Sequence, residues 1–343
     1  MIYSITARKI LRHCSYFGCY LFLLMLAACS SPTMPECDPK VYSLTGDTIC
    51  EYPFFPMGEI MLNNDHLAMI NPMDAEQIQL LDTQTGQMTY LSIKDSLNQP
   101  GSVAFPLSFF HYGSRSYFQY EIKDEQLKIA KQNFRFKNRV INRAVQLNKR
   151  KYVTLGFFQE GLLGLYDKRS KKIDYFGHYP VNVTIPFEKD AKNQIVQFFQ
   201  GNIAFSEKHS KVVYCSDFFA YISCYQFTGR RLKFRWEQSP VPLPTVSIVD
   251  GSVKQDRTVT NGGFSDVSIS GDYIFASYRQ NTVTDSITTI SNMILAYDMD
   301  GNHIATYHTD CSITKLKVDI EKKSMYGLSV TDDPVIVRFS FEI

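Results

Sequence analysis

The protein has 343 residues, of which 44% are hydrophobic, 20% charged and 14% aromatic. This apolar content can build one large core or two ordinary ones, which excludes a disordered, collagenous or coiled-coil chain. Because 36 lysines and arginines are balanced by 34 acidic residues, no basic excess exists to neutralise a nucleic-acid backbone. Only one apolar run, near the N-terminus, approaches membrane-spanning length, which excludes a polytopic membrane protein.

The first 28 residues have the pattern of a signal peptide. Arg8, Lys9 and Arg12 precede a nearly uncharged apolar stretch, residues 16–28, which is short for a transmembrane helix and ends in two alanines. The run Leu26-Ala27-Ala28-Cys29 resembles the bacterial lipobox, whose cysteine is joined to diacylglycerol and becomes the acylated N-terminus. We therefore expect a lipoprotein anchored at Cys29. An ordinary signal peptide and a retained anchor are the alternatives.

The segment after the cysteine indicates which membrane holds the lipoprotein and where the folded domain starts. Lipoproteins kept in the inner membrane carry aspartate after the cysteine, whereas this chain has Ser30, so we expect the outer membrane, on its periplasmic or surface side. Residues 31–39 contain three prolines, which suits an extended tether. The predicted organisation is a signal peptide over 1–28, lipidated Cys29 with its tether over 29–39, and one domain over 40–343.

Five further cysteines follow Cys29, at positions 37, 50, 215, 224 and 311, and no C-x-x-C or Cys/His metal spacing occurs. Cys215 and Cys224 flank a candidate hairpin turn. Export permits disulfides, but isolated cysteines on strands are more often buried free thiols. Both interpretations remain open for this pair.

A repeated strand–turn–strand pattern runs through the rest of the chain, whose short segments rich in Val, Ile, Tyr and Phe are typical of strands. In each copy a strand ends in an aromatic or aliphatic residue and a polar one, and a turn leads into the next strand. The clear copies pass through Leu80–Asp82, Leu165–Asp167, Cys224–Gln226 and Ala296–Asp298, and the weaker ones through Gln119–Glu121 and Val337–Phe339. These units predict an all-β fold, a six-bladed β-propeller.

The last unit ends after its third strand, which would leave an open sheet edge. The spare segment Lys40–Leu44 precedes the first unit. We therefore expect this N-terminal strand to close the last blade as its outer strand.

Several segments of the second half resemble the TolB-like six-bladed propeller lipoproteins of Gram-negative bacteria. They are Gly156–Phe158, Gly161–Asp167, Phe176–Pro180, Tyr273–Arg279, Tyr297–Asn302, Met325–Leu328 and Ile336–Phe339. The resemblance covers roughly residues 140–343, whereas residues 50–135 fit only by the strand pattern. It implies a propeller and a location in the cell envelope, and it implies no particular reaction.

Polar residues on the predicted inner strands are the candidate ligand contacts, because these strands line a propeller's channel. They are Asn142, Arg143, Gln200, Asn202, Ser265, Asp266 and Lys315. Arg143 and Asp266 could pair across the ring or present a charge pair to a ligand. The alternative is that such residues bond to neighbouring blades or to water in the channel. Most aromatic residues are expected between blades, and residues 105–112 and 238–262 are alternative recognition segments.

No local motif indicates catalysis, a metal or a cofactor. Asp298–Asn302 has oxygen ligands at alternate positions, as in a calcium loop, but Asp-Gly between two strands favours a tight hairpin turn. The histidines lack metal-ligand spacing, and no G-x-S-x-G, P-loop or G-x-G-x-x-G occurs. No catalytic residues are assigned.

The sequence thus favours a monomeric, non-enzymatic binding or scaffold module that is attached to the membrane by lipid and recognises an envelope protein or a glycan, without a cofactor and without nucleic acid. A propeller hydrolase or lyase acting on a polysaccharide or peptide is the alternative. It would need acid and base groups that converge from different blades.

Overall fold

The computed structural model divides into two units, residues 1–38 and 39–343. The residues that it describes are 38–52, 59–63, 65–70, 77–92, 105–111, 116–123, 126–129, 134–136, 141–180, 196, 198–243, 246–249, 252–255, 262–279, 291–330 and 333–343. The predicted leader, Cys29 and nearly all of the tether lie outside them. Among these residues there is no helix with the length and apolar character needed to cross a bilayer.

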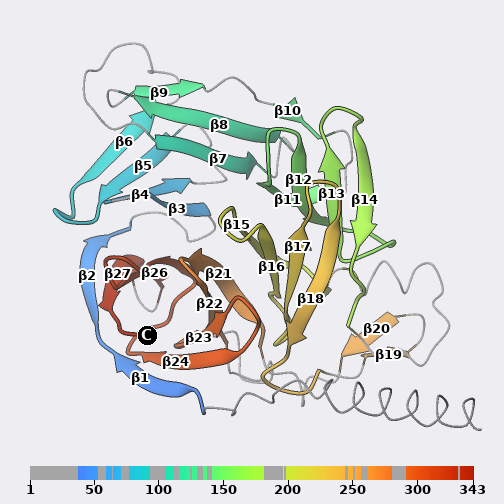
Figure 1. Cartoon of the computed structure of the whole chain (residues 1–343). Coiled ribbons are helices and arrows are strands. Elements are labelled where there is room, and N and C mark those ends of the chain that lie inside the picture. The colour runs from blue at the N-terminus through green and yellow to red at the C-terminus, as the bar shows by residue number, and fades with distance from the viewer. Residues whose placement is uncertain are drawn as a thin grey trace, which may run out of the picture. The chain divides into compact units, whose positions relative to one another are not determined.

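The strands form six sheets, numbered 1 to 6 in chain order, and a separate hairpin (Figure 1). Sheet 1 holds β3 (Glu59–Asn63), β4 (His66–Ile70), β5 (Gln77–Asp82) and β6 (Met88–Ser92), and sheet 2 holds β7 (Phe105–His111), β8 (Ser116–Lys123), β9 (Gln126–Ile129) and β10 (Phe134–Arg135). Sheet 3 holds β11 (Ile141–Gln146), β12 (Lys151–Gly156), β13 (Leu163–Asp167) and β14 (Lys172–Phe176).

Sheet 4 consists of β15 (Gly201–Ser206), β16 (Lys211–Ser216), β17 (Ile222–Phe227) and β18 (Leu232–Gln238). The hairpin of β19 (Val246–Val249) and β20 (Ser252–Gln255) follows. Sheet 5 holds β21 (Phe264–Ser270), β22 (Tyr273–Tyr278), β23 (Met293–Asp298), β24 (His303–Thr309) and β1 (Lys40–Leu44). Sheet 6 holds β25 (Lys315–Asp319), β26 (Ser324–Ser329), β27 (Val335–Ser340) and β2 (Gly46–Glu51).

The first strand of each sheet contacts the first strand of the next sheet. The contacts run from β3 to β7, β11, β15, β21 and β25 and return from β25 to β3. Within each sheet the following strands pair antiparallel and lead away from this inner ring. The protein is therefore an all-β propeller, as its composition and strand pattern predict. Five of its sheets have four strands, and sheet 5 has five.

The repeated sequence pattern corresponds to the turn from the third to the outer strand of a sheet. In three such turns the aspartate that ends the third strand accepts two backbone amides through Oδ1. Asp82 accepts from Gln84 and Thr85, Asp167 from Arg169 and Ser170, and Asp298 from Asp300 and Asn302, at 2.8–3.0 Å. The hairpin interpretation of Asp298–Asn302 is thus confirmed. The weaker copy Gln119–Glu121 is different, because it lies on β8, the second strand of its sheet.

The N-terminal strand that completes sheet 6 is β2, and the prediction of Lys40–Leu44 for this place is wrong. β2 pairs antiparallel with β27, whereas β1 pairs parallel with β24 and adds a fifth strand to sheet 5. Between the two strands, the carboxylate of Asp310 accepts the amide of Gly46 at 3.2 Å. A side chain at Gly46 would collide with Val337 and Phe339. The β2 segment is polar and begins with glycine, so its sequence does not indicate a strand. Only its fit against β27 shows that it forms one.

Side chains of β21 join sheets 5 and 6 in place of a backbone ladder. At three alternate positions of β21, a side-chain oxygen accepts an amide of β25 or of the residue after it. The pairs are Asp266 with Leu316 at 2.9 Å, Ser268 with Val318 at 3.2 Å, and Ser270 with Ile320 at 3.0 Å. Since successive strand residues point to opposite faces, this spacing of two is what one face of β21 can supply.

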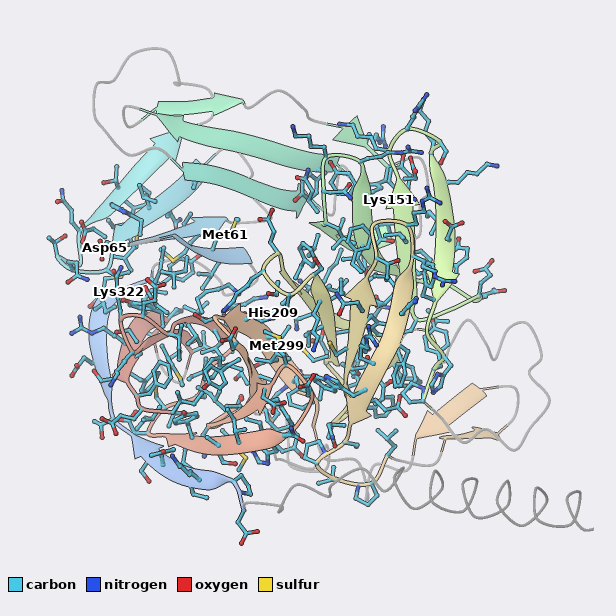
Figure 2. All side chains as sticks on the ribbon, viewed as in Figure 1. Met61, Asp65, Lys151, His209, Met299 and Lys322 are labelled. Carbon is cyan, nitrogen blue, oxygen red and sulfur yellow. The ribbon has the colours of Figure 1, made fainter. Side chains whose placement is uncertain are left out.

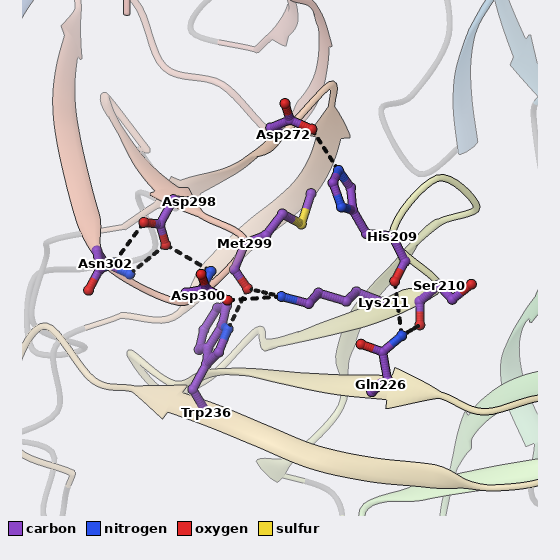
Figure 3. A network of polar contacts seen from close by, with 10 residues as sticks. All are labelled: His209, Ser210, Lys211, Gln226, Trp236, Asp272, Asp298, Met299, Asp300 and Asn302. Carbon is purple, nitrogen blue, oxygen red and sulfur yellow. Dashed lines mark hydrogen bonds and ion pairs between the residues drawn. The ribbon is translucent and has the colours of Figure 1, made fainter. Parts of the chain in front are cut away.

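Charged turns at one rim provide further ties between neighbouring sheets. The turn before β16 contributes His209, whose Nε2 lies 2.7 Å from Oδ1 of Asp272, and Lys211 Nζ donates to the carbonyl of Met299 at 2.5 Å (Figure 3). Asp65 and Lys322 form the corresponding tie between sheets 1 and 6, at 2.7 Å (Figure 2). The first and last sheets of the chain are thus joined by an ion pair as well as by strand contacts.

The core is aromatic, and its largest fully buried side chains are all tyrosines and phenylalanines. Apolar clusters combine residues of neighbouring sheets, such as Leu163 of β13 with Tyr214 and Tyr225 of sheet 4. Cys215 and Cys224 belong to one cluster and are free, buried thiols. This confirms the free-thiol interpretation. The two residues are not opposite each other, because Cys215 pairs with Ile222.

Replacing Gly301 should destabilise the protein. Gly301 has a φ of +92°, and a Cβ there would lie 2.6 Å from the Trp236 ring. We expect Gly301→Ala to lower the free energy of unfolding by about 2 to 4 kcal/mol, because strain and overpacking add. Gly229 is the matched control, since it has a φ of +78° in the corresponding turn of sheet 4 with open space around it. Gly229→Ala should cost only about 1 kcal/mol. Urea unfolding measures both, and equal losses would contradict the packing argument.

The side-chain ties between β21 and β25 can be tested in the same way. Ser268→Ala leaves the buried amide of Val318 without its acceptor, so the free energy of unfolding should fall by about 1 to 3 kcal/mol. Ser270→Ala is the comparison, because the Ile320 amide lies in a less buried place and water can replace the lost partner. A loss at position 270 as large as that at 268 would mean that the ties do not depend on burial.

Candidate functional site

The predicted ligand contacts gather where the inner strands begin. In each sheet the start of the inner strand pairs with the end of the second strand, as Ile141 with Gly156, Gly201 with Ser216, and Phe264 with Tyr278. The first residues of β11, β15, β21 and β25 therefore lie beside the residues that follow β12, β16 and β22. We call this surface the strand-end face.

Most of the predicted contacts form hydrogen bonds between sheets. Asn142 donates to the side chain of Gln200, which joins sheets 3 and 4. Asn202 donates to the backbone oxygen of Ser265 at 3.0 Å, and Ser265 donates to the carbonyl of Ile313 at 3.0 Å. These bonds continue from sheet 4 through sheet 5 to the start of sheet 6. These side chains therefore fit the alternative interpretation, in which polar residues of the inner strands bond to neighbouring blades.

Asp266 also contributes to this connection and does not pair with Arg143 in the way the sequence suggested. One of its oxygens accepts the Leu316 amide, and the same oxygen lies 3.3 Å from Nζ of Lys317. The other accepts the amide of Val267 at 2.9 Å. The carboxylate is thus occupied by groups of sheets 5 and 6, because β25 lies alongside β21.

Two charged residues that sequence reasoning missed complete the strand-end face. Asp217 follows β16, and Arg279 follows β22. Nη2 of Arg279 donates to the backbone oxygen of Asp217 at 2.7 Å, and Asn202 donates to the Asp217 carboxylate at 2.9 Å. The two residues occupy the same position after the second strand of successive sheets. Aligning the repeats on their second strands, rather than on the turn after the third strand, would have identified both.

Asp217 lies in the field of several positive charges. Part of the residue touches solvent, but burial of its carboxyl raises the pKa. Three cations, Arg143, Arg279 and Lys315, act to lower the pKa, while Asp266 raises it. Burial also lowers the pKa of the Arg279 guanidinium. The strand-end face therefore places one largely buried carboxyl in the field of several positive groups.

Exposed aromatic residues lie just after the second strands of sheets 3 and 4. Phe157 follows β12 and is 41% exposed, and Phe218 follows Asp217 and is 48% exposed. The Phe218 ring has Phe198 at its edge, with ring centres 6.2 Å apart. Both aromatic residues belong to the strand-end face, on sheets 3 and 4. Neither lies in the segments 105–112 or 238–262 that the sequence offered as alternatives.

Groups suited to metal binding or acid–base chemistry do not coincide with this cluster. Within the described part of the chain, no three His, Cys, Asp or Glu side chains come together as metal ligands. The described histidine–carboxylate pairs are His66 with Asp82, His178 with Glu237, and His209 with Asp272. These pairs share no residue with the strand-end cluster of Asp217 and its cations.

Residues 107–321 match the family described as TolB-like 6-blade propeller-like. The chain belongs to this TolB-like family. The match confirms the resemblance that the segments of the second half indicate, and it extends beyond them into sheet 2. None of the curated proteins matches the chain.

Solved structures are similar to the chain at low sequence identity. A member of the DUF4221 family from Bacteroides vulgatus has a TM-score of 0.53 at 9% identity, over 87% of this chain and 96% of that one. The β-propeller domain of Cps50 (Swd1) from Myceliophteria thermophila has a TM-score of 0.45 at 10% identity, over 87% and 100%. BamB from Moraxella catarrhalis has a TM-score of 0.35 at 11% identity, over 82% and 69%.

The raised pKa of Asp217 predicts a pH dependence of stability. A raised pKa means that the folded state keeps the proton at pH values where the unfolded chain, with a pKa of about 3.9, has lost it. The free energy of unfolding should therefore fall as the pH rises from about 4 through the folded pKa. Asp217→Asn should make the free energy of unfolding depend less on pH. At pH values above the folded pKa of Asp217, the variant should be the more stable form. Urea unfolding from pH 4 to pH 7 measures this, and a steeper dependence in the variant would contradict the assignment.

Proposed function

We propose that this TolB-like propeller is a non-enzymatic binding module of the cell envelope. Residues 1–28 would direct export, Cys29 would carry the lipid that holds the protein on the outer membrane, and residues 29–39 would tether the domain 40–343. The strand-end face would recognise an envelope protein or a glycan. The lipobox resemblance and the family's envelope address support the location.

The observation that carries the binding role is that Phe157 and Phe218 are exposed on the same strand-end face that carries the charged group of Asp217. Aromatic side chains and arginine are enriched where proteins bind partners, and aromatic rings also present flat faces for stacking. The residues around them are fixed by hydrogen bonds between sheets, so binding would lose little conformational freedom. Confinement to a membrane would further raise the local concentration of an envelope partner.

We also infer that the propeller has six blades. Five sheets have the usual four strands, and sheet 5 would count as a blade with an added strand, because its inner strand β21 contacts both β15 and β25. Six blades agree with the description of the family. The added strand β1 would then extend sheet 5 and would have no part in closing the ring.

The hydrolase alternative receives less support from the same face. Among the described residues, two carboxyls lie in this region, Asp217 and Asp266, and a glycosidase would need both free to act. Asp266 is held by the Leu316 amide and Lys317, which leaves Asp217 alone. The binding role needs no second acid and is the proposal that we retain.

Photocrosslinking in intact cells tests the binding role. A photoreactive phenylalanine analogue would replace Phe218 on the strand-end face or, as the matched control, Phe234 on β18. Phe234 is 49% exposed against 48% for Phe218, and each ring has one aromatic neighbour. We expect a discrete adduct from position 218 that is at least fivefold stronger than any from position 234. The adduct would be detected by gel shift and mass spectrometry.

The same cells test the anchor. Cys29→Ser should abolish labelling with a radioactive fatty acid and release the protein from the membrane or leave it with an uncleaved leader. The adduct at position 218 should weaken, because the tethered concentration is lost. Equal adducts at 218 and 234 would refute recognition through the strand-end face, and lipid labelling that persists in the variant would refute anchoring at Cys29.

A further inference from the structure

We propose that the strand-end face binds the hydroxyl groups of a neutral oligosaccharide, with Arg279 of sheet 5 and Asn142 of sheet 3 as the hydrogen-bonding ends of the site. The inference rests on the proposed function, because it selects the glycan from the two kinds of partner that the binding role allows. It is carried by two side-chain atoms, Nε of Arg279 and Oδ1 of Asn142. Both are buried and have no hydrogen-bond partner in the described part of the chain.

Arg279 and Asn142 belong to one hydrogen-bonded network that crosses sheet 4. Asn142 donates to the side chain of Gln200, the residue before β15. The backbone oxygen of Gln200 accepts the amide of Asp217 at 2.9 Å. The backbone oxygen of Asp217 in turn accepts Nη2 of Arg279 at 2.7 Å. The two ends of the proposed site are therefore linked through only Gln200 and Asp217.

The backbone at Gly263 holds Arg279 beside this network. The backbone oxygen of Gly263 accepts the Arg279 amide at 2.9 Å. A Cβ at Gly263 would lie 2.4 Å from the backbone oxygen of Ser216 and 2.5 Å from that of Asp217, so the chain before β21 packs directly on the end of β16. The side chain of Arg279 therefore starts from a backbone that is fixed against Asp217.

The bonds of Gln200 decide which atom of Asn142 is left without a partner. Nε2 of Gln200 donates to the backbone oxygens of Val196 at 2.9 Å and Gly156 at 3.5 Å. Oε1 of Gln200 then faces Asn142, and because this oxygen can only accept, Asn142 presents its amide nitrogen to it. The atom left over at Asn142 is an acceptor, whereas Nε of Arg279 is a donor.

A ligand that completes the network must both donate and accept hydrogen bonds. A carboxylate offers only acceptors and would leave Oδ1 of Asn142 unpaired, and an ammonium group offers only donors and would leave Nε of Arg279 unpaired. A buried polar atom without a partner is costly. A hydroxyl group satisfies either atom, which is why we infer a sugar rather than an ion.

The position of the two atoms indicates more than one sugar unit. They belong to sheets 3 and 5, on either side of sheet 4, so the hydroxyl groups must come from separate places on the ligand. Phe218 follows Asp217 in the chain and is 48% exposed, and its ring offers a flat face against which a sugar could stack. Sugar hydroxyls can displace ordered water from such a site, because they reproduce the hydrogen bonds of the water.

An array of neutral and acidic oligosaccharides tests the proposal. It would be probed with the purified full chain in a detergent without a sugar headgroup, and the strongest neutral binder would then be titrated by calorimetry. Arg279→Lys keeps the positive charge but lacks the Nε donor, so the affinity should fall roughly tenfold. Arg150→Lys is the matched control and should keep the affinity, because Nε of Arg150 already donates to Asp167 at 2.9 Å.

A second pair of variants tests the acceptor. Asn142→Leu should weaken binding by roughly tenfold. Gln79→Leu is its matched control and should keep the affinity, because Oε1 of Gln79 is likewise buried without a partner but lies on β5 of sheet 1. Thermal unfolding shows whether each variant is folded, and Arg279→Lys decides the outcome if Asn142→Leu is not.

Three results would overturn the proposal. They are no binding to the array, binding to acidic oligosaccharides alone, and an affinity for neutral ones that Arg279→Lys and Asn142→Leu both retain. Ordered water would then be the partner of both buried atoms.

The sugar site and the binding role fail in different ways. An adduct between position 218 and a protein, without oligosaccharide binding, would keep the binding role and remove the sugar site. Oligosaccharide binding that depends on Arg279, without an adduct in cells, would keep the sugar site and remove the proposed recognition of an envelope partner.

Discussion

The closure of the ring is the constraint on which the rest of this structure depends. The first and last sheets come from opposite ends of the domain, and β2 must pair with β27 before sheet 6 is complete. The contact of β3 with β25 and the ion pair of Asp65 with Lys322 belong to the same seam. An open sheet edge would otherwise expose unpaired backbone groups. Closure therefore fixes the inner strands and, through them, the residues of the strand-end face.

Side chains rather than backbone groups join the sheets to one another. Inner strands of neighbouring sheets contact each other without forming one continuous sheet, so their edge amides need other acceptors. The oxygens of Asp266, Ser268 and Ser270 supply them along β25, and Asn202 and Ser265 continue the connection. This demand explains why polar residues occur on inner strands.

The repeats could be predicted because each depends on neighbouring residues. The turn aspartates Asp82, Asp167 and Asp298 bond to amides two to four residues away. By contrast, the order in which β1 and β2 join the sheets could not be predicted. Both are short segments near the N-terminus, and β2 has a polar composition. Their partners, β24 and β27, lie more than 250 residues away in the chain, and only the fit around Gly46 selects between them.

The sequence by itself determined the all-β composition, the repeat, the family and the set of polar inner-strand residues, because strand propensity, turn chemistry and alternation are local properties. The tertiary structure alone decided which of those polar residues are used in joining sheets. It also brought Asp217 and Arg279 together from two sheets. Those relations depend on how the sheets lie against one another. The cost of burying a charge arises only when distant strands exclude water from it.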